Sequence, residues 1–456
     1  MPFVTGPLPQ RLKLVHGFGA VAFGVKDSGF SFFLLPFYNL VLGVDASTVG
    51  AALAAALVID ALVDPLIGHL SDRTYTKWGR RLPWLYLAPW PLALVWTMLW
   101  SPPFTGTPGF WDIVALAVGV RLLLSACEVP SVSLVPEITD DYDDRTTLFR
   151  YRFLSGWLGG LLMMVLTFTV FLPTPQSQLQ PEGYASYGLF GAALIALSVI
   201  GSAAAQHRIV AQLPERRPPP FSITGAFAEI FDAFREKAFV IFALGGLAAY
   251  VLQGMTFSIT QYVNLYVWQF SELAFQLYPA VLFLSVVLMF VIVGPLHRRW
   301  GKPKSAALGA LVGLAFYCSP YVFYLAGAWP TVGTTASTAL LYGFLVCANT
   351  ASVVAIISAT SMVAEIVEAF EERTGQRAEG TFYAGNWLVQ KCATGGGILL
   401  TSLIVQSIDL APGTPQAEVA PETVRQLVWL FMLAATVLAS IAAFWLARFP
   451  ISREQH

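Results

Sequence analysis

The chain has 456 residues, of which 56% are hydrophobic and 12% charged, and its mean hydropathy is +0.65. Soluble domains carry about 25% charged residues, so this composition excludes an ordinary soluble globule. The formal net charge of −1 argues against a nucleic-acid-binding protein, and the four scattered cysteines, without C-x-x-C spacing, indicate neither a zinc site nor a disulfide framework.

Apolar segments long enough to cross a bilayer recur along the whole chain, at roughly 20 residues per crossing. The first six predicted spans lie near residues 12–43, 47–72, 82–102, 109–138, 148–173 and 184–210. The second six lie near residues 237–268, 272–297, 303–327, 333–368, 379–408 and 421–448. We therefore expect three parts: an N-terminal six-helix bundle (1–210), a central cytoplasmic loop with a short surface helix (211–236) and a C-terminal six-helix bundle (237–456).

The basic residues predict the orientation of these spans. With both termini inside the cell, only Lys26, Arg121, Lys391 and Arg425 of the 26 lysines and arginines fall outside the cytoplasmic segments. Such an asymmetry is what the positive-inside rule describes. The sequence therefore predicts an integral protein of the cell membrane with both termini in the cytoplasm.

An internal repeat relates the two sets of spans. The segment "VPEITDDYDDRT" at 135–146 matches "VAEIVEAFEERT" at 363–374, and "WGRRLP" at 78–83 echoes "WGKPKS" at 300–305. Each pair lies on equivalent predicted cytoplasmic loops. This pattern predicts an all-α membrane protein with twelve transmembrane helices in two pseudo-symmetric six-helix halves, which is the architecture of major facilitator transporters.

Charged residues interrupt five of the predicted spans. They are Lys26 and Asp27 in the first, Asp60 and Asp64 in the second, Arg121 and Glu128 in the fourth, Arg152 in the fifth and Lys391 in the eleventh. By insertion scales an aspartate at the centre of a membrane helix costs about 2.5–3.5 kcal/mol. Structural ion pairs between helices are one explanation for such residues, and a binding site is the other.

The aspartate pair of the second span favours a cation site. Asp60 and Asp64 are one turn apart and share a helix face, so they repel unless a positive charge lies between them. A bound Na⁺ or a shared proton would supply that charge, and Glu128 with Ser125, one turn before it, would add oxygen ligands. We expect a coupling cation, Na⁺ or H⁺, and no other cofactor.

Three segments, residues 60–85, 128–152 and 379–391, resemble the glycoside–pentoside–hexuronide:cation symporters. The resemblance implies a cation-coupled symporter that imports a small solute by alternating access. It implies that Asp60, Asp64 and Glu128 serve the cation, as metal ligands if the ion is Na⁺. For the sugar it implies the residues Asp27, Glu128, Arg152 and Lys391.

Further residues join the predicted substrate site. Lys26 neighbours Asp27, and Arg121 could meet an anionic substrate such as a uronide. Tyr383 and Trp387, one turn apart and before Lys391, could face a cavity. The expected partners are a small solute and the lipid bilayer, with no nucleic acid and no obligate protein partner.

Departures from the family pattern leave alternatives open. Glu128 replaces an aspartate, so cation selectivity is undecided, and Val132 and Ile356 stand where sugar-contacting tryptophans are expected. An aliphatic lining would suit a sodium-coupled lysophospholipid symporter, and a facilitator without coupling is also possible. A membrane-embedded prenyltransferase, whose paired aspartates would bind Mg²⁺ and a diphosphate, is disfavoured because the acidic clusters "DALVD" and "DDYDD" lie at different predicted depths.

Overall fold

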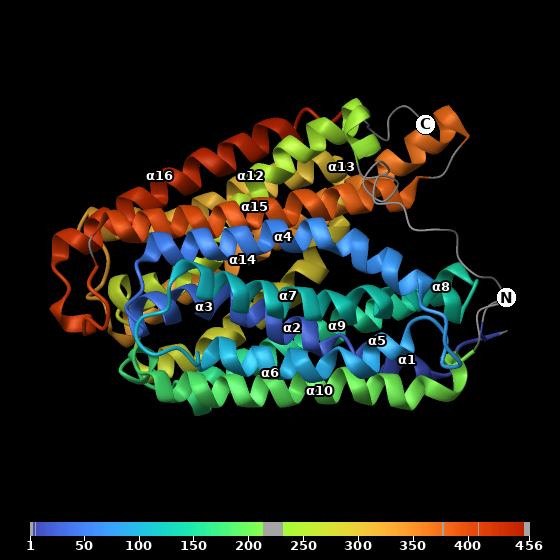
Figure 1. Cartoon of the computed structure of the whole chain (residues 1–456). Coiled ribbons are helices and arrows are strands. Elements are labelled where there is room, and N and C mark those ends of the chain that lie inside the picture. Colours follow the sequence, from blue (N-terminus) through green and yellow to red (C-terminus); the bar gives the residue numbers. More distant parts are fainter. Residues whose placement is uncertain (1–2, 5, 213–230, 376–377, 409, 451–456) are drawn as a thin grey trace. The chain divides into compact units, whose positions relative to one another are not determined.

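The computed structural model describes residues 3–4, 6–212, 231–375, 378–408 and 410–450, which form helices joined by loops and no sheet (Figure 1). The chain packs as two compact units, Met1–Val44 with Ala55–Ala226 and Asp45–Ala54 with Phe227–His456. Most of the predicted central loop, 211–236, lies outside the described residues. The predicted domain limits therefore stay a prediction.

The first unit holds the helices of the N-terminal part, and it includes α4 from Ala55 onwards. They are α1 (Gln10–Phe18), α2 (Val21–Ser28), α3 (Leu34–Pro36), α4 (Ala46–Arg73), α5 (Leu82–Leu87), α6 (Pro89–Trp100), α7 (Phe110–Ser133), α8 (Val135–Ile138), α9 (Tyr142–Leu166) and α10 (Pro181–Val210). The helices of the second unit are α12 (Lys237–Tyr262), α13 (Glu272–Leu325), α14 (Thr335–Thr374), α15 (Glu379–Ser407) and α16 (Pro421–Leu446).

The predicted spans are present in the described residues, three of them in an altered form. Ten helices in the described residues are long and apolar enough to cross a membrane. The predicted span at 82–102 is present as α5 and α6, which are separate because Pro89 starts a new helix. The 54-residue α13 contains two predicted spans, which meet at Gly301, whose φ of 73° interrupts the helix and favours glycine.

The predicted loop around the "DDYDD" cluster at 140–144 is only partly correct, because residues 140–141 are not helical but the residues after them are. α9 begins at Tyr142, before the predicted start of the span at 148. The Asp141 side chain caps this helix by accepting a hydrogen bond from the Asp144 backbone N–H at 2.8 Å. Asp144 in turn pairs with Lys13 of α1 at 3.2 Å. The acidic cluster is thus a helix start, where negative charge is favourable.

Two local features of the structure occur in both units and support the internal repeat. Arg81 beside α5 pairs with Glu137 of α8 at 3.1 Å, and Lys302 pairs with Glu365 at 2.9 Å, so in both units the two repeated motifs contact each other. The first long helix of each unit also ends in a π-helical turn, Phe37–Val41 in one and Val263–Val267 in the other. The two halves therefore share local structure as well as sequence.

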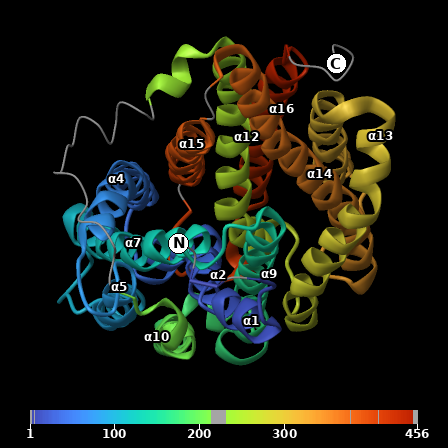
Figure 2. The same ribbon diagram turned by 90° about the vertical axis from the view of Figure 1, so that its right-hand side faces the viewer.

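A close approach of α2 and α9 organises the first unit (Figure 2). A Cβ atom built on Gly24 would lie 1.7 Å from the backbone oxygen of Gly156, so the two backbones touch without an intervening side chain. Small residues permit such contacts between membrane helices. Because Arg152 lies one turn before Gly156, this contact also brings its guanidinium over the ring of Phe23 on α2, 5.5 Å from the centroid.

Substituting Gly24 by alanine is expected to destabilise the first unit. The new methyl group would force α2 and α9 apart, at a cost of about 1–3 kcal/mol for overpacking. Gly343→Ala on α14 is the matched control, because its Cβ would meet no atom within 4 Å. Thermal unfolding in detergent should show a lower Tm for Gly24→Ala alone, and equal Tm values for the two variants would contradict this packing.

Candidate functional site

Asp60 is the centre of a buried polar cluster in the first unit. Its side chain on α4 is only 4% exposed, and its Oδ2 atom accepts a hydrogen bond from Nη1 of Arg121 at 3.0 Å. Its Oδ1 atom accepts a hydrogen bond from the Ser125 hydroxyl, also at 3.0 Å. Arg121 and Ser125 are one turn apart on α7, so a single helix face supplies both donors. Both carboxylate oxygens are thereby engaged by the protein.

An aromatic ring encloses the same ion pair. The guanidinium carbon of Arg121 lies 4.5 Å from the centroid of the Phe30 ring, in the π-helical turn Gly29–Phe33 that follows α2. A cation over an aromatic face is attracted by the ring quadrupole, more strongly where water is excluded. Arg121 is itself buried, and its guanidinium contacts the Asp60 carboxylate and the Phe30 ring.

The other predicted cation ligands lie on the same two helices. Asp64 follows Asp60 by one turn on α4, and Glu128 follows Ser125 on α7; both are partly buried. Glu128 interacts electrostatically with Arg152. In the described part of the chain no three His, Cys, Asp or Glu side chains are grouped so that they could hold a metal ion. The assignment of Asp60, Asp64, Glu128 and Ser125 to a cation therefore stays a prediction.

Two further predicted site residues form a pair at the surface of α2. Lys26 and Asp27 are joined by an ion pair, in which the Lys26 side chain is largely covered while Asp27 is 67% exposed. Arg152 lies deeper in the unit: it is buried and its Nη1 donates to the Ser131 hydroxyl of α7 at 2.6 Å. The structure thus places the predicted sugar ligands of the first unit at different depths.

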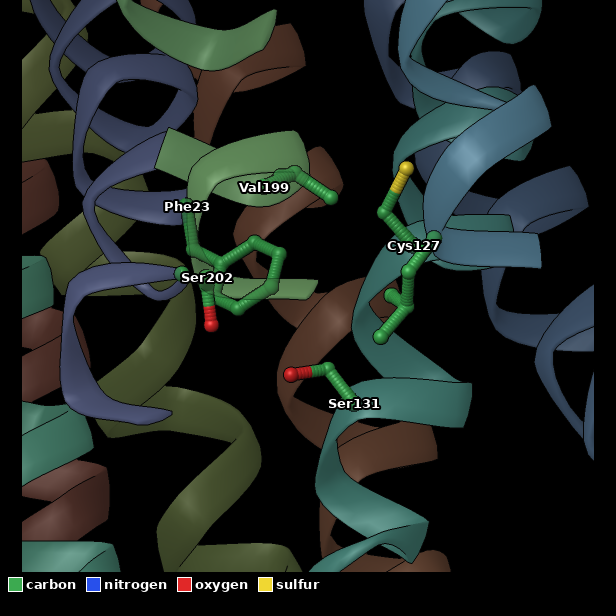
Figure 3. A pocket seen from close by; sticks show the side chains of 7 residues that line it. Phe23, Cys127, Ser131, Val199 and Ser202 are labelled. Atoms are coloured by element: carbon green, nitrogen blue, oxygen red, sulfur yellow. The ribbon is translucent and has the colours of Figure 1, made fainter. Parts of the chain in front are cut away.

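A narrow cleft, with no room for a solute in this structure, adjoins the Arg152 contact. Its lining residues come from α2, α5, α7, α10 and the turn before α2, and they are Gly19, Phe23, Leu85, Cys127, Ser131, Val199 and Ser202. Figure 3 shows Phe23 and Ser202 on one side and Ser131 on the other. Because Ser131 also accepts the hydrogen bond from Arg152, the cleft combines hydroxyl groups, a ring and a nearby cation.

The sequence prediction missed the polar residues behind this cleft. His16 of α1 is fully buried and its Nδ1 lies 3.2 Å from Oε1 of Gln206, whose Nε2 donates to Ser202 at 3.3 Å. Ser202 and Gln206 lie one turn apart on α10, which is a periodicity that could have identified them. Neutral hydroxyl and amide side chains give only a weak signal in a sequence, and His16 has no partner at ligand spacing.

The remaining predicted substrate residues belong to the second unit. Tyr383, Trp387 and Lys391 follow one another at one-turn intervals along α15. Tyr383 packs against the hydrophobic core of that unit, Trp387 is 53% exposed and Lys391 is partly buried. Their assignment to substrate binding stays a prediction.

Comparisons with known proteins agree on a class of membrane transporter. Residues 15–453 match the model of a family described as MFS/sugar transport protein. An uncharacterized symporter of Synechocystis sp. is 27% identical over 97% of this chain and 94% of its own length. An isoprimeverose transporter of Lactiplantibacillus pentosus is 30% identical over 35% of this chain and 33% of its own. The crystal structure of the nucleoside transporter NupG shares the fold, with a TM-score of 0.66 at 15% identity, covering 97% of this chain and 100% of that one.

Replacing Asp60 by asparagine is expected to lower stability much more than the same change at Asp27. Asp60→Asn leaves the buried Arg121 charge uncompensated, and breaking a buried pair typically costs about 3–5 kcal/mol. Asp27→Asn breaks a pair whose carboxylate is exposed, and the loss is expected to cost roughly 0–1 kcal/mol. Thermal unfolding of the purified variants compares the two, and a similar Tm for both would show that Asp60 contributes no buried ion pair.

Proposed function

Because this chain belongs to the MFS/sugar transport protein family, we propose that it is a cation-coupled symporter that imports a small polar solute by alternating access. Membership of the family makes it an integral membrane transporter and removes the prenyltransferase alternative. Within the family's range we propose a glycoside, pentoside or hexuronide as the solute. The positive-inside asymmetry supports cytoplasmic termini at the cell membrane.

The concentration of charged and hydroxyl groups inside the first unit is the observation that carries this proposal. Asp60, Arg121 and Arg152 are buried in helices that are otherwise apolar. Ionisable residues inside membrane helices are costly and are typical of substrate and ion pathways. The carboxylates near these cations are groups to which a coupling ion can bind. The similarity to a protein named as a symporter supports the coupling of transport to an ion gradient.

The side chains beside Arg152 support a polar solute by their chemistry. Ser131 and Ser202 present hydroxyl groups there, and Phe23 presents an aromatic surface. Ligand sites typically combine an apolar wall with a few placed polar groups that fix orientation. The similarity to an isoprimeverose transporter supports a sugar among polar solutes. Val132 follows Ser131 on α7. Because an aliphatic side chain at this position would suit a lysophospholipid, that solute is included in the test.

Uptake into proteoliposomes tests the solute and the coupling together. Radiolabelled glycosides, pentosides, hexuronides and a lysophospholipid are supplied with an inward Na⁺ gradient, an inward H⁺ gradient or no gradient. We expect a sugar derivative to accumulate above its external concentration only with a gradient. Accumulation of the lysophospholipid would show that the solute is not a sugar. Equilibration of the solute without any gradient would show facilitated diffusion instead of symport.

Replacing Asp64 by asparagine is expected to abolish gradient-driven accumulation while the protein remains folded. The substitution removes the charge through which a cation would act, and keeps the size of the side chain. Asp45→Asn is the matched control, since Asp45 is an exposed carboxylate just before the same helix. Accumulation by Asp64→Asn at the level of the control would remove Asp64 from the coupling site.

A further inference from the structure

We propose that Arg121 is a tethered cation that takes, at Asp60, the place a coupling Na⁺ would need, so that Na⁺ does not bind at this carboxylate. The inference rests on the proposed function in one respect, since it excludes Na⁺ from one carboxylate of the proposed coupling site. It follows from three properties of the cluster: the use of both Asp60 oxygens, the charge already present and the enclosure of the guanidinium.

Both oxygens of Asp60 are already hydrogen-bonded within the protein. Oδ2 accepts from Arg121 and Oδ1 accepts from Ser125, each at 3.0 Å. Hard cations require several oxygen ligands that face inward onto the ion. A Na⁺ ion at Asp60 would have to share these two oxygens with a charged donor and a hydroxyl group. Among the described residues no other acidic or metal-ligating cluster completes such a cage.

The charge required beside Asp60 is also already present. Two acidic residues one turn apart on α4 need a neighbouring positive charge, and Arg121 supplies it from α7. A second cation at the same carboxylate would face the guanidinium at short range in a buried site, where solvent screens the repulsion poorly. The arrangement therefore disfavours Na⁺ both by occupied ligands and by like charge.

Arg121 differs from a bound ion because it cannot leave. Its guanidinium is covalently attached to α7. The Phe30 ring covers it at 4.5 Å, and the side chain is only 7% exposed. A substrate role for Arg121, as predicted from the sequence, would require it to give up Asp60. The geometry instead assigns it to the carboxylate.

Sodium itself is the probe that tests this inference. Thermal unfolding of the purified full-length chain in detergent is followed while NaCl replaces choline chloride at a constant ionic strength of about 150 mM. The wild type is expected to show no change in Tm. Arg121→Gln, which exposes the Asp60 carboxylate to added cation, is expected to gain a Na⁺-dependent rise of about 2–4 °C.

Three further variants separate a tethered cation from a general change in stability. Arg121→Lys keeps a positive charge at the same position and should remain insensitive to Na⁺. The double variant Arg121→Gln/Asp60→Asn should lose the response gained by Arg121→Gln, because the ligand is gone. Arg425→Gln is the control for the loss of an arginine charge: Arg425 donates to the backbone oxygen of Leu325, so its loss should create no Na⁺ response.

Two outcomes would overturn the inference. One is a Na⁺-dependent rise in the Tm of the wild type that disappears in Asp60→Asn, because Na⁺ would then bind beside Arg121. The other is a folded Arg121→Gln with no response to Na⁺. If that variant fails to fold, the wild-type measurement still decides. Failure of every solute to accumulate under any gradient would remove the proposed symport and leave these Tm results unaffected.

Discussion

A carboxylate buried among apolar helices must find its counterion inside the bundle, and the first unit is built around the way Asp60 meets this condition. Arg121 provides the opposite charge, Ser125 fills the second oxygen and Phe30 covers the cation. These contacts tie α4, α7 and the turn after α2 to one another. The energetic penalty of burying the pair is acceptable only because the partners satisfy each other in good geometry.

The contact between α2 and α9 positions a second polar region of the unit, the one around Arg152. With Gly24 against Gly156, the helices are close enough for Arg152 to reach both Phe23 and Ser131. The hydroxyl groups of the cleft and the chain from Ser202 through Gln206 to His16 lie on the neighbouring helices. Arg152 thus donates to a neutral hydroxyl group and lies over a ring, with Glu128 as a charged neighbour, which differs from the direct ion pair at Asp60.

Much of this organisation could be read from the sequence, because hydropathy and repeats are properties of the chain itself. The spans, the two related halves and the positions of Asp60, Arg121 and Arg152 all follow from residue order. The partner of Arg121 does not follow from it. The sequence places Arg121 and Glu128 on one face of α7, while the ion pair forms with Asp60 of another helix, a choice made by tertiary packing. The early start of α9 was missed because a run of aspartates resembles a loop, although Asp141 is a good helix cap.

The likeness of the two halves has a consequence for stoichiometry. Both halves join their repeated motifs by an ion pair, Arg81 with Glu137 and Lys302 with Glu365, and both end their first helix in a π turn. Yet residues 273–296 of α13, the duplicate of the aspartate-bearing helix, contain no charged side chain. Duplication has therefore kept the scaffold in two copies and the paired carboxylates in one. Any cation site built on this pair is therefore present once in each polypeptide, because the duplicate helix has no equivalent acid.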